Sequence, residues 1–308
     1  MKTADNLQMI LCRCLLMLPA MSLLVSGCSE RQTKEVLLEF KQQPNEKYVY
    51  HVADSVEWEF VDVDQKRYAF QHLQDQKSEM VIESLDSALV RSLTMMFMIT
   101  KDTVLNAPDF VTRRRRKSEV GQEFGFVLRM RQNGEIVKVV TEDPKVAFQF
   151  DRMYKPSQPV FPGRAIAPGY KWAQNFSVEM PHGGKPTIAT TEYRLNSFTK
   201  IDEFDCAVID FNGALEYEDT YKPPEDKPAE FLLRKYRSRL TSEGRLFFAY
   251  REGFMVKRTN LITSTVLTTT YKKDNTEQQS QTVVKDYELI TLTAIHRAGQ
   301  DSITYNVP

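Results

Sequence analysis

The sequence predicts a mainly β protein, α+β at most, built from long antiparallel strands. Apolar and polar side chains alternate over long stretches, Asn133-Gly134 separates two such stretches, and residues 259–271 are rich in Thr, Val, Ile and Leu. Alternation with a period of two is typical of a strand with one buried face. Asn-Gly is a strong hairpin signal because both residues tolerate positive φ, and β-branched residues favour strand over helix.

The first long strand is expected at Lys47–Val61. Its apolar residues share one parity: Tyr48, Tyr50, Val52, Val56, Trp58 and Phe60. Polar residues lie between them: His51, Ser55, Glu57 and Glu59. The next segment, residues 79–98, fits either helical or strand spacing, and its β-branched residues favour strand.

Two hairpins and a final strand follow from the same patterns. Phe124–Met130 pairs with Ile136–Val140 through Gly134, and Arg245–Tyr250 pairs with Phe254–Tyr271 through Gly253. Residues 287–295 are expected to form the last strand. One short helix is expected at residues 145–154, because Asp143-Pro144 offers an N-cap followed by proline at the first helical position.

Prolines 156, 159, 162 and 168 predict an extended connector over residues 156–168. It would join two β-rich halves, residues 46–155 and 169–298, and a tail of residues 299–308 would follow. The order of strands and hairpins is alike in the two halves, as an internal duplication would leave it. A β-rich chain can repeat such features without duplication, so both explanations stay open.

The first 27 residues predict a lipoprotein signal peptide. Arg13 precedes an apolar run, Cys14–Val25, that is shorter than the ~20 residues a spanning helix needs. The run ends in Leu24-Val25-Ser26-Gly27-Cys28, which resembles the lipobox of bacterial lipoproteins. The resemblance implies cleavage after Gly27, a lipid on Cys28 and a tether over residues 28–45. An uncleaved N-terminal anchor helix is the alternative.

The residues around the lipobox extend this expectation. Ser29 resembles the pattern of lipoproteins sorted to the outer membrane, so the resemblance implies a lipid-anchored protein of the bacterial cell envelope. Cleavage would remove Cys12 and Cys14, and a lipid on Cys28 would leave Cys206 as the remaining thiol. No intramolecular disulfide is then expected. The apolar neighbours of Cys206 predict a buried thiol in a strand.

The whole predicted mature chain resembles a family of bacterial envelope lipoproteins, and three segments carry the resemblance together with the lipobox. They are Phe161–Trp172, with its proline-rich entry and Gly-aromatic-x-Trp strand, Tyr193-x-Leu195, and the hairpin Gly244–Phe254. The arrangement of long strands also resembles lipoprotein carriers built on an open half-barrel with an apolar concave face. This resemblance implies curved open sheets or a half-barrel that binds an apolar ligand or a protein partner.

No catalytic constellation stands out in the sequence. GxSxG, HExxH and CxxC patterns do not occur, and the four histidines (His51, His72, His182 and His296) are far apart. We therefore expect a non-enzymatic protein without a metal or cofactor. Basic and acidic residues both number 41, which argues against a nucleic-acid partner. A structural envelope scaffold and a hydrolase with an unrecognised site are the alternative functions.

Two charged clusters have competing explanations. The basic run is formed by Arg113, Arg114, Arg115, Arg116 and Lys117. It predicts an exposed loop or, as a functional interpretation, a contact with an anionic lipid surface. The acidic residues Glu216, Glu218 and Asp219 are expected in a solvated loop, because a calcium loop would need a glycine and a bidentate glutamate that are missing.

Overall fold

The structure is a computed structural model that describes residues 34–109, 120–141, 158–178, 186–224 and 230–305. The chain divides into two compact units, residues 1–34 and 35–308. All described strands belong to the second unit. The predicted signal peptide, Cys28 and the helix expected at residues 145–154 lie outside the described residues.

The secondary-structure elements whose bounds are described in the second unit are all strands, as the sequence predicted. The strands are β1 (Lys47–Val61), β2 (Arg67–Leu85), β3 (Arg91–Leu105), β4 (Glu123–Met130), β5 (Ile136–Val140), β6 (Lys171–Val178), β7 (Thr187–Ile201), β8 (Phe204–Tyr221), β9 (Phe231–Ala249), β10 (Phe254–Lys272), β11 (Glu277–His296) and β12 (Ile303–Thr304). The first strand has the bounds that its alternation predicted. Residues 79–98, whose sequence pattern fitted either helix or strand, contribute to the strands β2 and β3.

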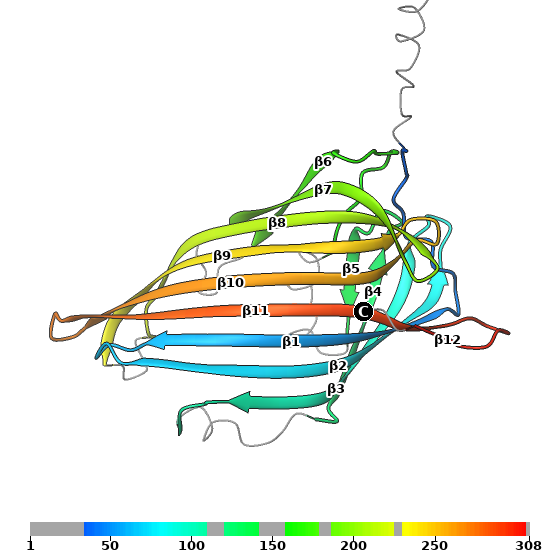
Figure 1. Cartoon of the computed structure of the whole chain (residues 1–308). Coiled ribbons are helices and arrows are strands. Elements are labelled where there is room, and N and C mark those ends of the chain that lie inside the picture. Colours follow the sequence, from blue (N-terminus) through cyan, green and yellow to red (C-terminus); the bar gives the residue numbers. More distant parts are fainter. Residues whose placement is uncertain (1–33, 110–119, 142–157, 179–185, 225–229, 306–308) are drawn as a thin grey trace, which may run out of the picture. The chain divides into compact units, whose positions relative to one another are not determined.

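The strands form a single 12-stranded antiparallel sheet that stays open. Its order is β5-β4-β3-β2-β1-β11-β10-β9-β8-β7-β6, and β12 pairs with β11 (Figure 1). Strands that are neighbours in the chain pair with each other except β5 and β6, which lie at the two edges of the sheet. At the middle, β1 pairs with β11 from Lys47↔His296 to Val61↔Gln281. The strands of both predicted halves therefore share one sheet.

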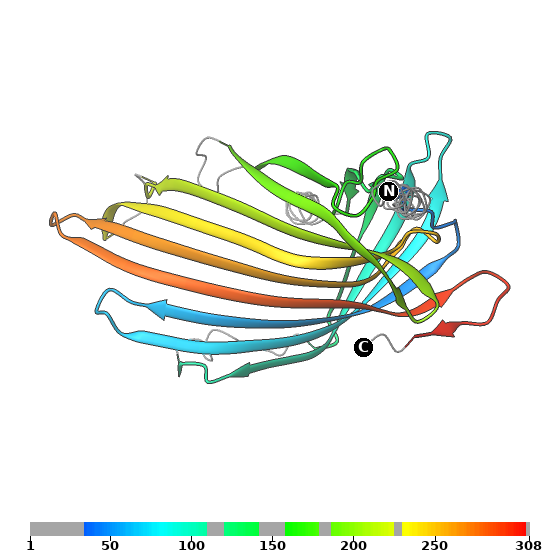
Figure 2. The ribbon, with the colours of Figure 1, turned by 45° about the horizontal axis from the view of Figure 1, so that its top comes forward.

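The sheet is strongly bent, as Figures 1 and 2 show. Buried residues of β4 and β8, which stand far apart in the strand order, belong to one hydrophobic cluster. The β4–β5 turn also reaches the opposite arm of the sheet, because Phe161 donates its backbone N–H to the carbonyl of Asn133 at 2.7 Å and packs its ring on Phe248 of β9. The face that carries this cluster is therefore the concave one.

The hydrophobic core occupies one end of this concave face. The long strands contribute fully buried side chains at this end of the face. Examples are Ile82, Leu195, Ile209, Phe248, Val256 and Leu292. Towards the other end of the same strands the side chains become partly exposed, as the burial of β10 and β11 illustrates. We call these two regions the packed end and the open end.

Segments outside the long strands complete the packed end. Val36 forms an isolated antiparallel bridge with Ile166, and the ring of Phe40 stacks on Phe161 with 5.4 Å between the ring centroids. The described parts of the predicted tether and connector therefore contribute to the core. Within residues 299–308, Tyr305 is buried and packs against Phe204.

Both predicted hairpin turns are confirmed, at β4–β5 and β9–β10. Gly134 has φ 91° and Gly253 has φ 80°, in the region that favours glycine. Gly244 has a different role, because a Cβ at this position would collide with the carbonyl oxygen of Thr259 and approach the ring of Phe211 to 2.6 Å. β9 can therefore pack closely against its neighbours only with glycine there.

One sequence expectation is wrong. Glu216, Glu218 and Asp219 lie in strand β8 and not in a loop. On the convex face of the sheet, Glu216 and Glu218 lie opposite Arg239 and Arg237 of β9, with N···O distances of 3.2 and 3.7 Å. Cross-strand pairing of opposite charges lets acidic residues occupy a strand.

Candidate functional site: the concave face of the sheet

Strand alternation and register place a large set of side chains on the concave face beyond the packed end. In β1 and β2 the even-numbered residues point to this face, since Tyr48 and Ile82 belong to the core. The same parity runs through β9, β10 and β11, and odd-numbered residues take it in β8. Residues of this face that are paired across neighbouring strands therefore form rows that run across the sheet.

Two rows at the open end are mostly apolar. The first row is Phe70, Trp58, Val284, Ser264, Leu240 and Leu215, and the second is Tyr68, Phe60, Thr282, Val266, Ser238 and Tyr217. The rings of Trp58 and Phe70 stack with 5.7 Å between centroids, and those of Phe60 and Tyr68 with 6.2 Å. These four aromatic residues remain partly exposed. We call the two rows the apolar rows.

A polar band lies between the apolar rows and the packed end. Gln74, Asp54, Glu288 and Asn260 pair successively across β2, β1, β11 and β10, and Asp286 lies opposite Val56 in the next row. We call Asp54, Asp286 and Glu288 the acidic cluster. All three carboxylates are partly buried on the same face, within two residues of one another along their strands.

The acidic cluster perturbs its own ionisation. Burial, followed by repulsion from Glu288, Asp286 and Asp75, raises the pKa of Asp54 to about 7. The pKa of Asp286 is raised by burial and by Glu288. Because the low-dielectric surroundings disfavour several charges at one place, part of the cluster holds protons near neutral pH.

Cationic partners around the cluster compensate it only in part. The Arg258 guanidinium Nε lies 3.9 Å from Glu288 Oε1, and its Cζ lies 5.2 Å from the centroid of the Phe211 ring. His72 Nε2 is 2.7 Å from Asp102 Oδ1, so that imidazole is already engaged by a carboxylate of β3. Arg258 and His72, which lies in the same row as Asp286 and is shared with Asp102, therefore face three carboxylates of the cluster.

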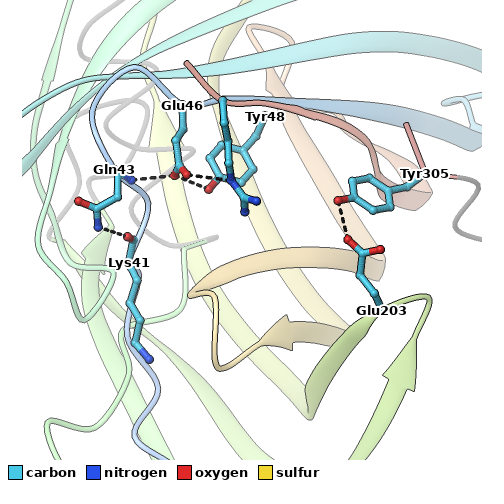
Figure 3. Close-up of polar contacts among 7 residues, drawn as sticks. Lys41, Gln43, Glu46, Tyr48, Glu203 and Tyr305 are labelled. Atoms are coloured by element: carbon cyan, nitrogen blue, oxygen red, sulfur yellow. Dashed lines mark hydrogen bonds and ion pairs between the residues drawn. The ribbon is translucent and has the colours of Figure 1, made fainter. Parts of the chain in front are cut away.

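The packed end closes one side of the concave face through a polar clamp (Figure 3). Glu46 Oε2 accepts hydrogen bonds from the Gln43 backbone N–H at 2.8 Å and from the Tyr48 hydroxyl at 2.7 Å. Glu46 Oε1 lies 3.1 Å from Arg297 Nε. Lys41 donates to the carbonyl of Tyr250 at 3.1 Å. The clamp joins the N-terminal segment to β1 and to the ends of β9 and β11.

The cysteines, histidines and basic run noted in the sequence do not gather at one site in the described part of the chain. Cys28 and the basic run Arg113–Lys117 lie outside the described residues, as does His182. Cys206 is buried in β8, and burial raises the pKa of its thiol to about 12, which agrees with the predicted core thiol. His51 is exposed on the convex face, 3.8 Å from Asp75, and His296 is close to Ser302.

The sequence analysis missed the acidic cluster, although a signal was present. Asp54 occupies the apolar parity of β1, between Val52 and Val56, and Asp286 and Glu288 interrupt the corresponding parity of β11 between Val284 and Ile290. A carboxylate at an inward-facing strand position is costly without a partner. Such an interruption is therefore a marker of a polar site on a buried face.

The convex face offers a different environment. A depression of about 560 Å³ lies there over β8, β9 and β10, lined by residues that include the Glu216–Arg239 and Glu218–Arg237 pairs. Its charged side chains are well exposed and paired. The concave face is therefore the better candidate for ligand binding.

No group of three or more His, Cys, Asp or Glu side chains in the described part of the chain is arranged to hold a metal ion. Among the same residues there is no helix of the length and hydrophobicity needed to cross a bilayer.

No family model and no curated protein matches this chain. Solved structures that resemble parts of this chain include lipovitellin, from a study of lipid–protein interactions, at 11% identity and a TM-score of 0.43. The match covers 87% of this chain and 27% of the lipovitellin chain, so this chain spans about a quarter of that protein. Another is a Bacteroides fragilis protein described as exported, with a YmcC-like fold, at 10% identity and a TM-score of 0.21, covering 80% and 97% of the two chains.

Proposed function

We propose that the chain is a non-enzymatic lipoprotein of the bacterial cell envelope that binds an apolar ligand on its concave face. The observation that carries the proposal is the pair of apolar rows at the open end, which leave stacked aromatic and aliphatic side chains partly exposed. Extended apolar surface that the chain itself does not cover is typical of a binding site for apolar molecules.

The curvature of the sheet supports the same proposal. A concave apolar surface can contact a flexible acyl chain on several sides, whereas a flat one contacts it on one side only. The packed end gives this surface a rigid boundary, because the polar clamp fixes residues 41–48 to β9 and β11. A protein segment is the alternative occupant of the same surface.

Ligand binding can be tested with matched leucine variants. Leu240 lies in an apolar row, and Leu267 lies on the convex face with similar partial exposure. We expect Leu240→Gln to weaken binding of Nile red to the purified full chain several-fold, and Leu267→Gln to leave it unchanged. Mass spectrometry of the protein isolated from bacteria should find a bound amphiphile. Equal binding by both variants, with no amphiphile bound, would contradict the proposal.

The proposed lipid on Cys28 is supported by the lipobox sequence Leu24–Cys28 and is independent of ligand binding. Membrane anchoring is therefore tested by a separate experiment. Two or more acyl chains hold a protein firmly on a bilayer, at ~0.8 kcal/mol per buried CH₂. Growth with a labelled fatty acid should label the wild-type chain, and Cys28→Ala should abolish the label. A labelled Cys28→Ala protein would refute the assignment.

A further inference from the structure

The acidic cluster carries more negative charge than its surroundings neutralise. Asp54, Asp286 and Glu288 face one another on β1 and β11, and Arg258 is the guanidinium that an ion pair places beside them, at 3.9 Å from Glu288. His72 acts favourably on the charge of Asp286 but is shared with Asp102, and Asp54 Oδ2 accepts a hydrogen bond from the neutral Gln76 amide at 3.4 Å. The positive charge beside the cluster therefore balances its three carboxylates only in part. Uncompensated carboxylates on a partly buried face are costly for a folded protein.

The cluster also presents hydrogen-bond acceptors that the protein does not use. Asp286 Oδ1, Glu288 Oε1 and Asn260 Oδ1 are buried atoms without a hydrogen-bond partner. Asn260 is itself only 7% exposed and lies directly opposite Glu288 on the concave face. Buried acceptors without donors are rare in native proteins, so a group that donates hydrogen bonds is expected to meet them.

We propose that the acidic cluster, together with Asn260, binds the primary ammonium group of an amphiphile whose apolar tail lies along the apolar rows. The inference rests on the proposed function and names the class of ligand. A primary ammonium carries one positive charge and three N–H donors, which match the excess charge and the unused acceptors. A phosphate or carboxylate headgroup would be repelled at the same place.

The spacing along the strands suits such a molecule. Asp54 and Trp58 are four residues apart on β1, on the same face, and a strand rises about 3.4 Å per residue. The headgroup position and the Trp58–Phe70 stack are therefore about 14 Å apart, a distance that the tail of a medium-chain amphiphile can span. Val56 and Ile262 continue the apolar contact between the two positions.

The fluorescence of Trp58 provides the assay. The chain has two tryptophans, and Trp172→Phe leaves Trp58 as the single reporter on the apolar rows. Decylamine, 1-decanol and decanoate share one tail and differ in headgroup, and they would be titrated below micelle formation at pH 8 into the full chain carrying Cys28→Ser. Decyltrimethylammonium, which has the charge without N–H donors, separates charge from hydrogen bonding.

We expect decylamine to bind about tenfold more tightly than 1-decanol, which is the effect of one partly screened ion pair. Decanoate should bind most weakly, and decyltrimethylammonium should fall between decylamine and 1-decanol. Asp286→Asn with Glu288→Gln should abolish the preference for decylamine and leave the affinity for 1-decanol unchanged. Asp54→Asn, which conserves shape, serves as an independent variant if the double variant does not fold. Glu218→Gln on the convex face is the matched control.

Other outcomes of these titrations would contradict either the ammonium inference or the proposed function. Equal affinities for decylamine and 1-decanol, or a preference that survives both variants, would overturn the ammonium inference and leave the apolar ligand proposal standing. Absence of binding by all four amphiphiles would overturn the proposed function itself. Loss of the preference in Glu218→Gln would show that net charge, and not the acidic cluster, selects the ligand.

Discussion

Replacement of Asp54 by Asn should stabilise the protein at alkaline pH and leave its stability at acidic pH nearly unchanged. The pKa of Asp54 is raised from 3.8 to about 7, first by burial and then by the neighbouring carboxylates. Below about pH 3 the carboxyl is protonated in both the folded and the unfolded chain. As the pH rises towards 7, only the unfolded chain releases the proton freely, so the free energy of unfolding falls.

The size of the effect follows from the two pKa values. Each pH unit between them is worth about 1.36 kcal/mol, so the full difference corresponds to about 4 kcal/mol. Asp54 is partly exposed on the concave face, and water and side-chain movement relieve part of this penalty. We therefore expect Asp54→Asn to raise the free energy of unfolding at pH 8 by about 1–2 kcal/mol.

Urea unfolding at a series of pH values, followed by tryptophan fluorescence, measures this difference. The wild-type chain should lose stability relative to Asp54→Asn between pH 4 and pH 7, with no further relative change above pH 8. Asp64→Asn, in the exposed β1–β2 turn, is the control and should track the wild type. A stability difference between wild type and Asp54→Asn that does not vary with pH would refute the reasoning.

Three further outcomes can be checked. Gly244→Ala should lower the free energy of unfolding by about 2–4 kcal/mol because the new methyl group collides with the adjacent strand, whereas Gly163→Ala, with open space around it, should change it little. Denaturation midpoints test both. Cys206, with the other three cysteines replaced by serine, should react with thiol reagents only as fast as the chain unfolds, and immediate labelling would contradict its burial. Arg113–Arg116→Ser should weaken salt-sensitive binding of the non-acylated chain to anionic vesicles, and unchanged binding would dispose of that surface contact.

Much of the fold was predictable because local patterns specify it. The alternation in Lys47–Val61 and the turns at Gly134 and Gly253 depend on neighbours in the chain, and all three predictions are confirmed. The pairing of β1 with β11 depends on contacts between residues more than two hundred positions apart, for which a single sequence carries no local signal. Glu216 was expected in a loop for a similar reason. Its partner on the next strand, Arg239, is not a neighbour in the chain, so local sequence gives no sign of the pairing.

The site was less predictable than the fold. An aromatic side chain such as Trp58 has the same sequence pattern whether it fills a core or lines an open face, and only the curvature of the sheet separates the two. Asp54 and Glu288 become a cluster only through the central pairing of β1 with β11. The proposals for Cys28 and for the basic run rest on sequence alone and stay predictions.

The central position of the β1–β11 pair has a consequence for biogenesis. β1 is made early and its main partner on one side is made late, so the middle of the sheet cannot assemble until almost the whole chain has left the ribosome. Until then, the inward-facing residues of β1 and β2 stay uncovered. Folding with such distant contacts is slow and exposes the chain to aggregation. The protein should therefore depend on a holdase chaperone until β11 has been made.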